Sequence, residues 1–179
     1  MMRWAIRLLS CYPIVQKRIQ EEIDTVVGKG KQVSWDLRSK MPYTMAVLKE
    51  IQRFADIAPT GLLHKTVCDV SLGGFELPQV NRVLKNNSQD HIINYIIKGT
   101  LVMANLSACH RDPKFWSKPD QFYPEHFLEN GALVEDKPGF LPYGVGKRMC
   151  PGATLADMQV KMSLRFVADF YFFVFFRFS

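Results

Sequence analysis

The sequence is poor in cysteine, and its few cysteines lie far apart. Its 179 residues contain 4 cysteines, at Cys11, Cys68, Cys109 and Cys150. No two of them form a CxxC pair, and no Cys/His spacing typical of a zinc site is present. These absences disfavour a disulfide-stapled scaffold, and they indicate a reducing compartment with mostly inert thiols.

The sequence also lacks the motifs of phosphate binding and of serine hydrolysis. It has no GxxxxGK[ST] loop to cradle a nucleotide phosphate and no GxSxG elbow. The net charge is +6, but the cations are scattered along the chain instead of forming a stripe with interleaved aromatics. We therefore expect no nucleic-acid partner. A mildly basic chain can still favour an acidic partner or an anionic membrane surface.

Long hydrophobic runs are missing as well. The N-terminal MMRWAIRLLSCYP carries cations inside a short apolar run and has no small-residue cleavage site, so it is a poor signal peptide. The C-terminal FVADFYFFVFFRFS is too short for a span of about 20 residues and is interrupted by Asp169 and Arg177. We expect no transmembrane segment within these residues.

The chain does have the composition of a globular protein, with 47% hydrophobic and 22% charged residues. Apolar residues at helical spacing predict a helix around Trp4–Leu9, a second from Pro13 to Val27 and a third from Pro42 to about Ile57. A last helix is expected from Pro151 onward. Its apolar stripe would comprise Leu155, Met158, Met162 and Phe166.

Short strands are expected between the third and the last helix. Residues 64–72 alternate like a strand, Gly73-Gly74 would make a turn, and residues 75–78 resume extended structure. Residues 99–108 are predicted as another strand. Residues 80–97 shift in composition to Asn and Ile without clear periodicity, and we interpret them as an intrusion or a long loop. The predicted fold class is mainly α with small β-sheets (α+β).

The stretch FLPYGVGKRMCPG contains glycines, prolines and two adjacent cations around one cysteine. Cys150 directly precedes Pro151, so we expect it at the N-terminal cap of the last helix, where unpaired N–H groups and the helix dipole favour an anion. Arg148 adds a cation nearby. An incidental cysteine in a turn is the alternative, but the full pattern favours a protected thiolate that faces a large ligand. Three glycines permit tight folding and close backbone approach: Gly144, Gly146 and Gly152.

Several other polar residues indicate a functional or structural site only when they are considered together. Glu50 and Arg53 lie at i and i+3 on the third predicted helix, so their side chains meet on one face. Alone, such a pair is usually a surface ion pair worth about 0.2–0.5 kcal/mol. His126, between aromatics in YPEHF, could cap a buried polar network. His64 and His110, taken alone, are more often packed or solvated histidines than ligands.

These pieces occur together and in this order in the cytochromes P450, the haem-thiolate monooxygenases, and the chain resembles the C-terminal part of that fold. PIVQKRIQEEIDTVVG resembles the helix before the family's ExxR helix, and KEIQR supplies the ExxR pair. APTGLLHKTVCDVSLGGFELP resembles the strands that follow, and KGTLVMANLSACHRDPKFWSKPDQFYPEHFL the meander region. YGVGKRMCPG, the cysteine loop, is among the more specific of these motifs. The likeness points to the microsomal, family-2-like branch of animals.

The resemblance implies a role for each matching residue. Cys150 would be the axial thiolate ligand to the iron of haem b, iron protoporphyrin IX. Arg148 and His64 would bind the haem propionates. The buried polar triad of the family would be Glu50, Arg53 and His126. Tyr143 and the three loop glycines would also border the haem. The substrate would contact Ala58, Pro59, Thr60, Gly61, Leu62 and Leu63.

The implied reaction inserts one oxygen atom of O2 into an apolar organic substrate and reduces the other to water. Electrons from NADPH would arrive through NADPH–cytochrome P450 reductase, with cytochrome b5 as a further candidate partner. The basic surface around Lys147 and Arg148 would help to dock such a partner, and a solvated cationic loop is an equal alternative. The resemblance places the protein on the cytosolic face of the endoplasmic reticulum membrane. It does not specify the substrate.

The sequence departs from the family pattern at several positions, and these departures limit what the resemblance implies for this chain. Tyr143 replaces a common Phe, His126 replaces a commoner Arg, residues 80–97 are extra, and residues 171–179 diverge. Because family members are more than twice as long, we expect residues 1–179 to form a partial domain without the membrane anchor, the oxygen-side helix or the oxygen-activating catalytic segment. Such a chain would be inactive alone. The alternatives are a truncated or mis-spliced chain that binds no cofactor and a cysteine-based redox or zinc protein, which lacks any paired thiol.

Overall fold

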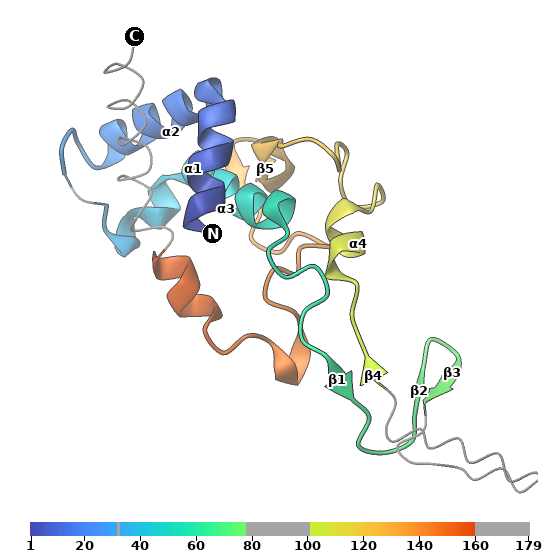
Figure 1. Cartoon of the computed structure of the whole chain (residues 1–179). Coiled ribbons are helices and arrows are strands. Elements are labelled where there is room, and N and C mark those ends of the chain that lie inside the picture. The colour runs from blue at the N-terminus through green and yellow to red at the C-terminus, as the bar shows by residue number, and fades with distance from the viewer. Residues whose placement is uncertain (32, 78–100, 160–179) are drawn as a thin grey trace, which may run out of the picture. The chain divides into compact units, whose positions relative to one another are not determined.

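The computed structural model describes residues 1–31, 33–77 and 101–159 (Figure 1). The chain divides into two compact units, Met1–Pro59 with Leu106–Ser179, and Thr60–Asn105. The helical elements are α1 (Met2–Cys11), α2 (Pro13–Val26), η1 (Trp35–Lys40), α3 (Pro42–Ala55), α4 (Leu106–Arg111), η2 (Pro124–Phe127) and η3 (Gly146–Arg148), and residues 153–159 are also helical. The strands are β1 (His64–Lys65), β2 (Val70–Leu72), β3 (Phe75–Leu77), β4 (Leu101–Val102), β5 (Leu128–Glu129) and β6 (Ala132–Leu133).

Two prolines set the starts of α2 and α3. Pro13 and Pro42 occupy the first turn of their helices, where the missing N–H costs no intrahelical hydrogen bond. Both starts match the sequence-based expectation. The three N-terminal helices pack their apolar sides into one core, whose buried members include Ala5, Leu8, Leu9, Ile19, Ile23, Met45, Leu48 and Ile51.

The helix α3 is buried on nearly all sides, with 10 of its 14 residues buried. Its N-terminus receives the Glu22 carboxylate, which accepts hydrogen bonds from the backbone N–H groups of Tyr43 (3.0 Å) and Thr44 (2.7 Å). It ends at Ala55, two residues before the predicted end, because Asp56 adopts a left-handed conformation with φ 46°. α3 is therefore the central element of the first unit.

The second unit contains two small antiparallel sheets. β1 pairs with β4, and β2 pairs with β3 through a tight hairpin whose turn residues Gly73 and Gly74 have φ of 59° and 83°. The turn was predicted, but the single strand predicted over residues 64–72 is wrong. Its two ends pair with different partners, and alternation alone does not reveal a change of partner.

Two other strand predictions are also wrong. Residues 99–108 were expected to be extended, but within the described part only Leu101–Val102 is a strand and Leu106 already begins α4. The buried residues of α4 are Leu106 and His110, which are four positions apart and so share a helix face. Residues 58–63, which the family resemblance implies to be a substrate-contacting strand, form bends and a turn, and β1 begins only at His64.

The meander between α4 and the cysteine contains a hairpin that the sequence analysis overlooked. β5 pairs with β6 across Asn130 and Gly131, whose φ values are 50° and 81°. An Asn-Gly dipeptide between short apolar runs was the available signal, since this turn needs positive φ at both positions. The helix η2 precedes the hairpin, and Ala46, Trp116 and Phe127 form a second small core between α3 and the meander.

The last helix begins later than expected. Pro151 and Gly152 form a turn, and residues 153–159 are helical. Leu155 is 65% exposed, so the predicted apolar stripe is not a core face at this position. Met162 and Phe166, the other half of the stripe, lie outside the described residues. Small antiparallel sheets beside a mainly helical framework confirm the predicted fold class. Across residues 1–31, 33–77 and 101–159, no helix has both the length and the apolar character to cross a membrane.

Candidate functional site

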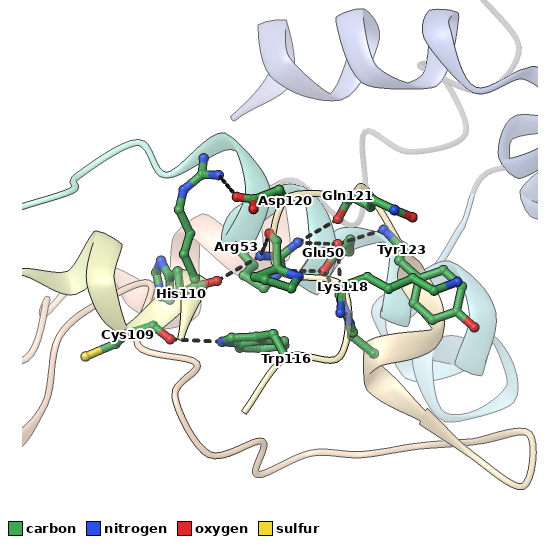
Figure 2. A network of polar contacts seen from close by, with 12 residues as sticks. Glu50, Arg53, Cys109, His110, Trp116, Lys118, Asp120, Gln121 and Tyr123 are labelled. Atoms are coloured by element: carbon green, nitrogen blue, oxygen red, sulfur yellow. Dashed lines mark hydrogen bonds and ion pairs between the residues drawn. The ribbon is translucent and has the colours of Figure 1, made fainter. Parts of the chain in front are cut away.

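Glu50 and Arg53 form a buried ion pair on α3 (Figure 2). Arg53 Nε lies 2.8 Å from Glu50 Oε2, and Arg53 Nη2 lies 2.7 Å from Glu50 Oε1. The two parallel bonds make a bidentate contact, in which the planar guanidinium matches the carboxylate. Both side chains are essentially inaccessible to solvent, at 0% and 1% exposure. The pair is therefore a buried structural element and not the surface ion pair that such spacing usually gives.

The remaining N–H groups of Arg53 point at backbone carbonyls of α4 and of the meander after it. Nη1 donates to the carbonyl oxygens of His110 (2.8 Å) and Pro119 (2.7 Å), and Nη2 donates to that of Gln121 (2.8 Å). With the two bonds to Glu50, all five guanidinium donors have an acceptor. Arg53 thereby fixes three separate points of residues 110–121 onto α3, which explains how a charge can be buried there.

His126 and Tyr123 complete the shell of the Glu50 carboxylate. The Tyr123 backbone N–H donates to Oε1 at 2.8 Å, and His126 Nδ1 lies 3.4 Å from both carboxylate oxygens. His126 Nε2 accepts a hydrogen bond from the Lys118 N–H at 3.2 Å, so the ring proton lies on Nδ1, toward Glu50. We call Glu50, Arg53 and His126 the polar network. It joins α3, η2 and the preceding loop.

His110 plays a connecting role that the sequence analysis did not assign. Its ring Nε2 accepts the Leu141 N–H at 3.0 Å, and its Nδ1 faces Asp56 Oδ1 at 3.4 Å. Burial lowers the pKa of His110, with Asp56 opposing and Arg53 and Arg111 adding to the shift. A neutral imidazole is what an accepting Nε2 requires. The sequence signal was weak, because a helical position in HRDP reveals neither burial nor partners.

The cysteine loop, residues 143–150, closes on itself through the backbone. The Cys150 N–H donates to the Tyr143 carbonyl at 2.9 Å, and the Met149 N–H donates to the Gly146 carbonyl at 3.1 Å. Gly144 and Gly146 have φ of 74° and 71°, a region that disfavours side chains. The loop therefore bends sharply at the two glycines before it reaches the thiol.

Tyr143 also ties the loop to the neighbouring helices through its hydroxyl. The hydroxyl donates to Asp157 Oδ1 at 2.6 Å and accepts from Gln52 Nε2 at 2.8 Å. Gln52 Nε2 also donates to Asp157 Oδ1 at 2.9 Å. Burial, followed by the bond to Asp157, raises the pKa of Tyr143 above its ordinary value. We call Gln52, Tyr143 and Asp157 the tyrosine cluster.

A cavity of about 270 Å³ lies next to the tyrosine cluster. It is bounded by α3 on one side, through Leu48 and Lys49, and by the cysteine loop on the other, through Tyr143 and Met149. Lys49 Nζ contacts the Val134 carbonyl at 3.2 Å and the carbonyl and carboxylate of Glu135 at 2.6 and 3.3 Å. The lysine charge is thus already engaged at the rim.

The outer part of the cysteine loop presents its functional groups to solvent. Cys150 carries a free, exposed thiol, and residues 145–150 are all exposed. Within the described part of the chain, Arg148 has no hydrogen-bond or ion-pair partner. Apolar side chains flank these groups, with Val145 63%, Met149 52% and Leu155 65% exposed. An exposed thiol, a cation without a partner among the described residues and exposed apolar side chains suit a large ligand that bears a metal and an anionic group.

The other predicted site residues lie partly in the second unit. His64 is exposed in β1, opposite Val102 in the ladder. Of the segment predicted to contact substrate, Ala58 and Pro59 belong to the first unit, and its other members, from Thr60 onward, to the second. A role for His64 and this segment beside Cys150 stays a prediction.

Comparison with protein-family models gives one match, described as Cytochrome P450, over residues 1–92 and 79–170. Together these two segments span nearly the whole chain. They overlap at residues 79–92, in the stretch that the sequence marks as an intrusion. The intrusion itself, which lies outside the described residues, stays a prediction.

Curated proteins named cytochrome P450 match most of the chain, and so does a hydroxylase. Cytochrome P450 2J3 of Rattus norvegicus is 43% identical over 159 residues, which cover 89% of this chain and 28% of the relative. Cytochrome P450 2J2 of Homo sapiens is 40% identical over the same shares. Vitamin D(3) 25-hydroxylase of Sus scrofa is 38% identical over 88% of this chain and 28% of its own length. The chain thus spans under a third of the length of the relatives it matches.

Proposed function

The chain belongs to the cytochrome P450 family, and we propose that Cys150 is the thiolate ligand of a haem iron in a monooxygenase. The observation that carries this proposal is the cysteine loop. Its free thiol lies exposed at the end of a glycine-shaped bend, two residues after Arg148, which has no partner among the described residues. A cysteine retained only for packing would be buried and inert.

The residues around the thiol fit a haem. A thiolate is a known ligand for haem iron, and Arg148 can form a charge-assisted bond with a propionate. The exposed Val145, Met149 and Leu155 offer apolar surface that a porphyrin face would cover. A Cβ added to Gly152 would lie 3.9 Å from the Cys150 sulfur, so the glycine leaves room on that side of the thiol. His64 is our second candidate for a propionate contact.

Each part of the site has a distinct task in the proposed reaction. A bound haem supplies the reductive activation of O2, which side chains alone cannot provide. Cys150 would hold the iron of a bound haem through its thiolate and would supply electron density to it. Arg148 would neutralise a haem propionate. The polar network holds the meander on α3, and the Cys150 N–H bond to Tyr143 holds the loop.

We further propose that the substrate is an apolar organic molecule, with electrons from NADPH through NADPH–cytochrome P450 reductase or cytochrome b5. Leu62 and Leu63, exposed by 83% and 65%, supply apolar surface for substrate contact in the second unit. The name of the porcine relative, a vitamin D(3) hydroxylase, supports this substrate class. We place the protein at the endoplasmic reticulum membrane, as expected for the microsomal branch.

The proposal is tested by titrating haem into the chain and recording the absorbance of the reduced carbon monoxide complex. Because the chain spans 28% of its relatives' length, we expect a weak thiolate-type Soret band. Cys150→Ser should abolish that band, whereas Cys68→Ser, which removes another exposed thiol, should leave it unchanged. Persistence of the band in Cys150→Ser would contradict the ligand assignment. Absence of any haem binding to the unmutated chain would favour the alternative of a non-catalytic chain.

A further inference from the structure

We propose that Tyr143 is a positioning residue for Cys150 and that it acts through the tyrosine cluster. The proposal rests on the proposed function of Cys150 as an iron ligand, and it adds a second anchoring system to the polar network. It concerns a hydroxyl group that a phenylalanine at this position would lack.

The first observation is the place of Tyr143 in the cysteine loop. Its carbonyl accepts the Cys150 N–H at 2.9 Å, so the residue forms the base of the loop that carries the thiol. The residues between Gly144 and Cys150 are exposed and have no buried side chain to hold them. The direction of the Cys150 side chain therefore depends on how firmly Tyr143 is held.

The second observation is that the Tyr143 hydroxyl is held from two helices at once. Gln52, only 9% exposed, approaches from α3 and donates at 2.8 Å, while Asp157 accepts at 2.6 Å from the helix that follows Cys150. Gln52 also donates to Asp157 at 2.9 Å, which closes a triangle of hydrogen bonds. Because Tyr143 lies before the thiol and Asp157 lies in the helix after it, the cluster ties the segments on both sides of the thiol to α3.

The third observation is that Gln52 lies between the two charged residues of the polar network. Glu50 and Arg53 contact the meander, while Gln52 contacts the cysteine loop. α3 therefore fixes the two segments from different faces, as residues two positions apart point in different directions on a helix. The acceptor at Asp157 makes its bond to the hydroxyl charge-assisted and short.

The chain offers a matched control for the hydroxyl. Tyr43 is buried and Tyr143 is partly buried, but the Tyr43 hydroxyl has no hydrogen-bond partner among the residues that the structure describes. Tyr143→Phe removes two hydrogen bonds, whereas Tyr43→Phe removes none. A difference in loop behaviour between the two variants is therefore caused by loss of the hydrogen bonds of the tyrosine cluster and not by loss of a phenolic hydroxyl as such.

The first measurement is amide hydrogen exchange at Cys150 in the full chain without haem. We expect Tyr143→Phe to speed exchange of this amide roughly tenfold, as the loss of a hydrogen bond to a charged partner predicts, and Tyr43→Phe to leave it unchanged. Asp157→Asn keeps an acceptor oxygen. The exchange rate of the Cys150 amide in this variant should therefore lie between the rates in the unmutated chain and in Asp157→Ala. These two variants carry the test if Tyr143→Phe does not fold. Equal exchange in the unmutated chain, Tyr143→Phe and Asp157→Ala would overturn the proposal.

The second measurement adds haem and follows the Soret band of the reduced carbon monoxide complex. We expect a smaller thiolate-type fraction in Tyr143→Phe than in Tyr43→Phe at equal bound haem, because a loose loop presents the thiolate less often. Equal fractions would overturn the positioning role. If the unmutated chain gives no thiolate band but the exchange rates differ as expected, the ligand assignment fails while the positioning of Cys150 by Tyr143 is supported.

Discussion

The polar network and the cysteine loop differ in whether their arginine side chains find partners among the described residues. In the network, Arg53 and Glu50 are buried, and each guanidinium donor has an acceptor. In the loop, Cys150 and Arg148 are exposed and Arg148 has no partner among the described residues. A group that is already satisfied stabilises the fold, whereas an unsatisfied, outward-facing group is available to a ligand. The difference separates a structural centre from the proposed binding surface.

The largest expected effect is loss of the Arg53 side chain. Arg53→Met would leave the Glu50 carboxylate buried without its partner, and breaking such a pair costs about 3–5 kcal/mol of the free energy of unfolding. Urea denaturation of the full chain measures this. The control is Arg111→Met, which breaks an exposed ion pair with Asp120 and should cost about 0–1 kcal/mol. Equal losses in the two variants would refute the contrast between the buried and exposed charges.

An intermediate effect is expected from acid. Burial lowers the pKa of His110 in the folded chain, so the unfolded chain takes up a proton first as the pH falls. Stability is therefore fully present above the ordinary histidine pKa of 6.5 and decreases as the pH falls through it. Protonation of His110 at Nε2 would also remove the acceptor of the Leu141 N–H and place two N–H donors opposite each other. The charged groups that face this ring are Asp56, Arg53 and Arg111.

The test is the free energy of unfolding measured between about pH 8 and pH 5. His110→Gln should lower stability at the higher pH and flatten the dependence on pH. His64→Gln serves as the control, because His64 is exposed in β1, and it should keep the slope of the unmutated chain. A slope that survives His110→Gln would assign the acid sensitivity to other groups.

The smallest expected effect on stability is at Arg148. Because its side chain is exposed and unpaired among the described residues, Arg148→Gln should change the free energy of unfolding by no more than about 0.5 kcal/mol. We expect haem affinity to fall several-fold in the same variant, since a propionate loses its cation. Lys147→Gln, one residue away, controls for net charge. A loss of affinity as large in Lys147→Gln would point to general electrostatics instead.

Several elements could be predicted because their signals are local. The starts of α2 and α3 follow from Pro13 and Pro42, and the β2–β3 turn follows from Gly73-Gly74. Elements whose signals depend on distant residues were missed. The sequence of α4 was predicted as part of a strand, because the burial of Leu106 and His110 on one helix face is known only from the structure. The strand predicted over residues 64–72 is two separate strands, β1 and β2, because its ends pair with different partners.

By itself, the sequence determined which side chains could meet within one helix or one loop. The i, i+3 spacing of Glu50 and Arg53, the glycines before Cys150 and the family pattern are all readable in it, because these relations need only a few consecutive residues. The tertiary structure alone decided that Arg53 reaches three backbone carbonyls within residues 110–121, that His110 holds Leu141, and that Tyr143 joins Gln52 to Asp157. Those contacts join residues 14 to 91 positions apart, and only folding brings such groups together and removes the water that would otherwise compete for them.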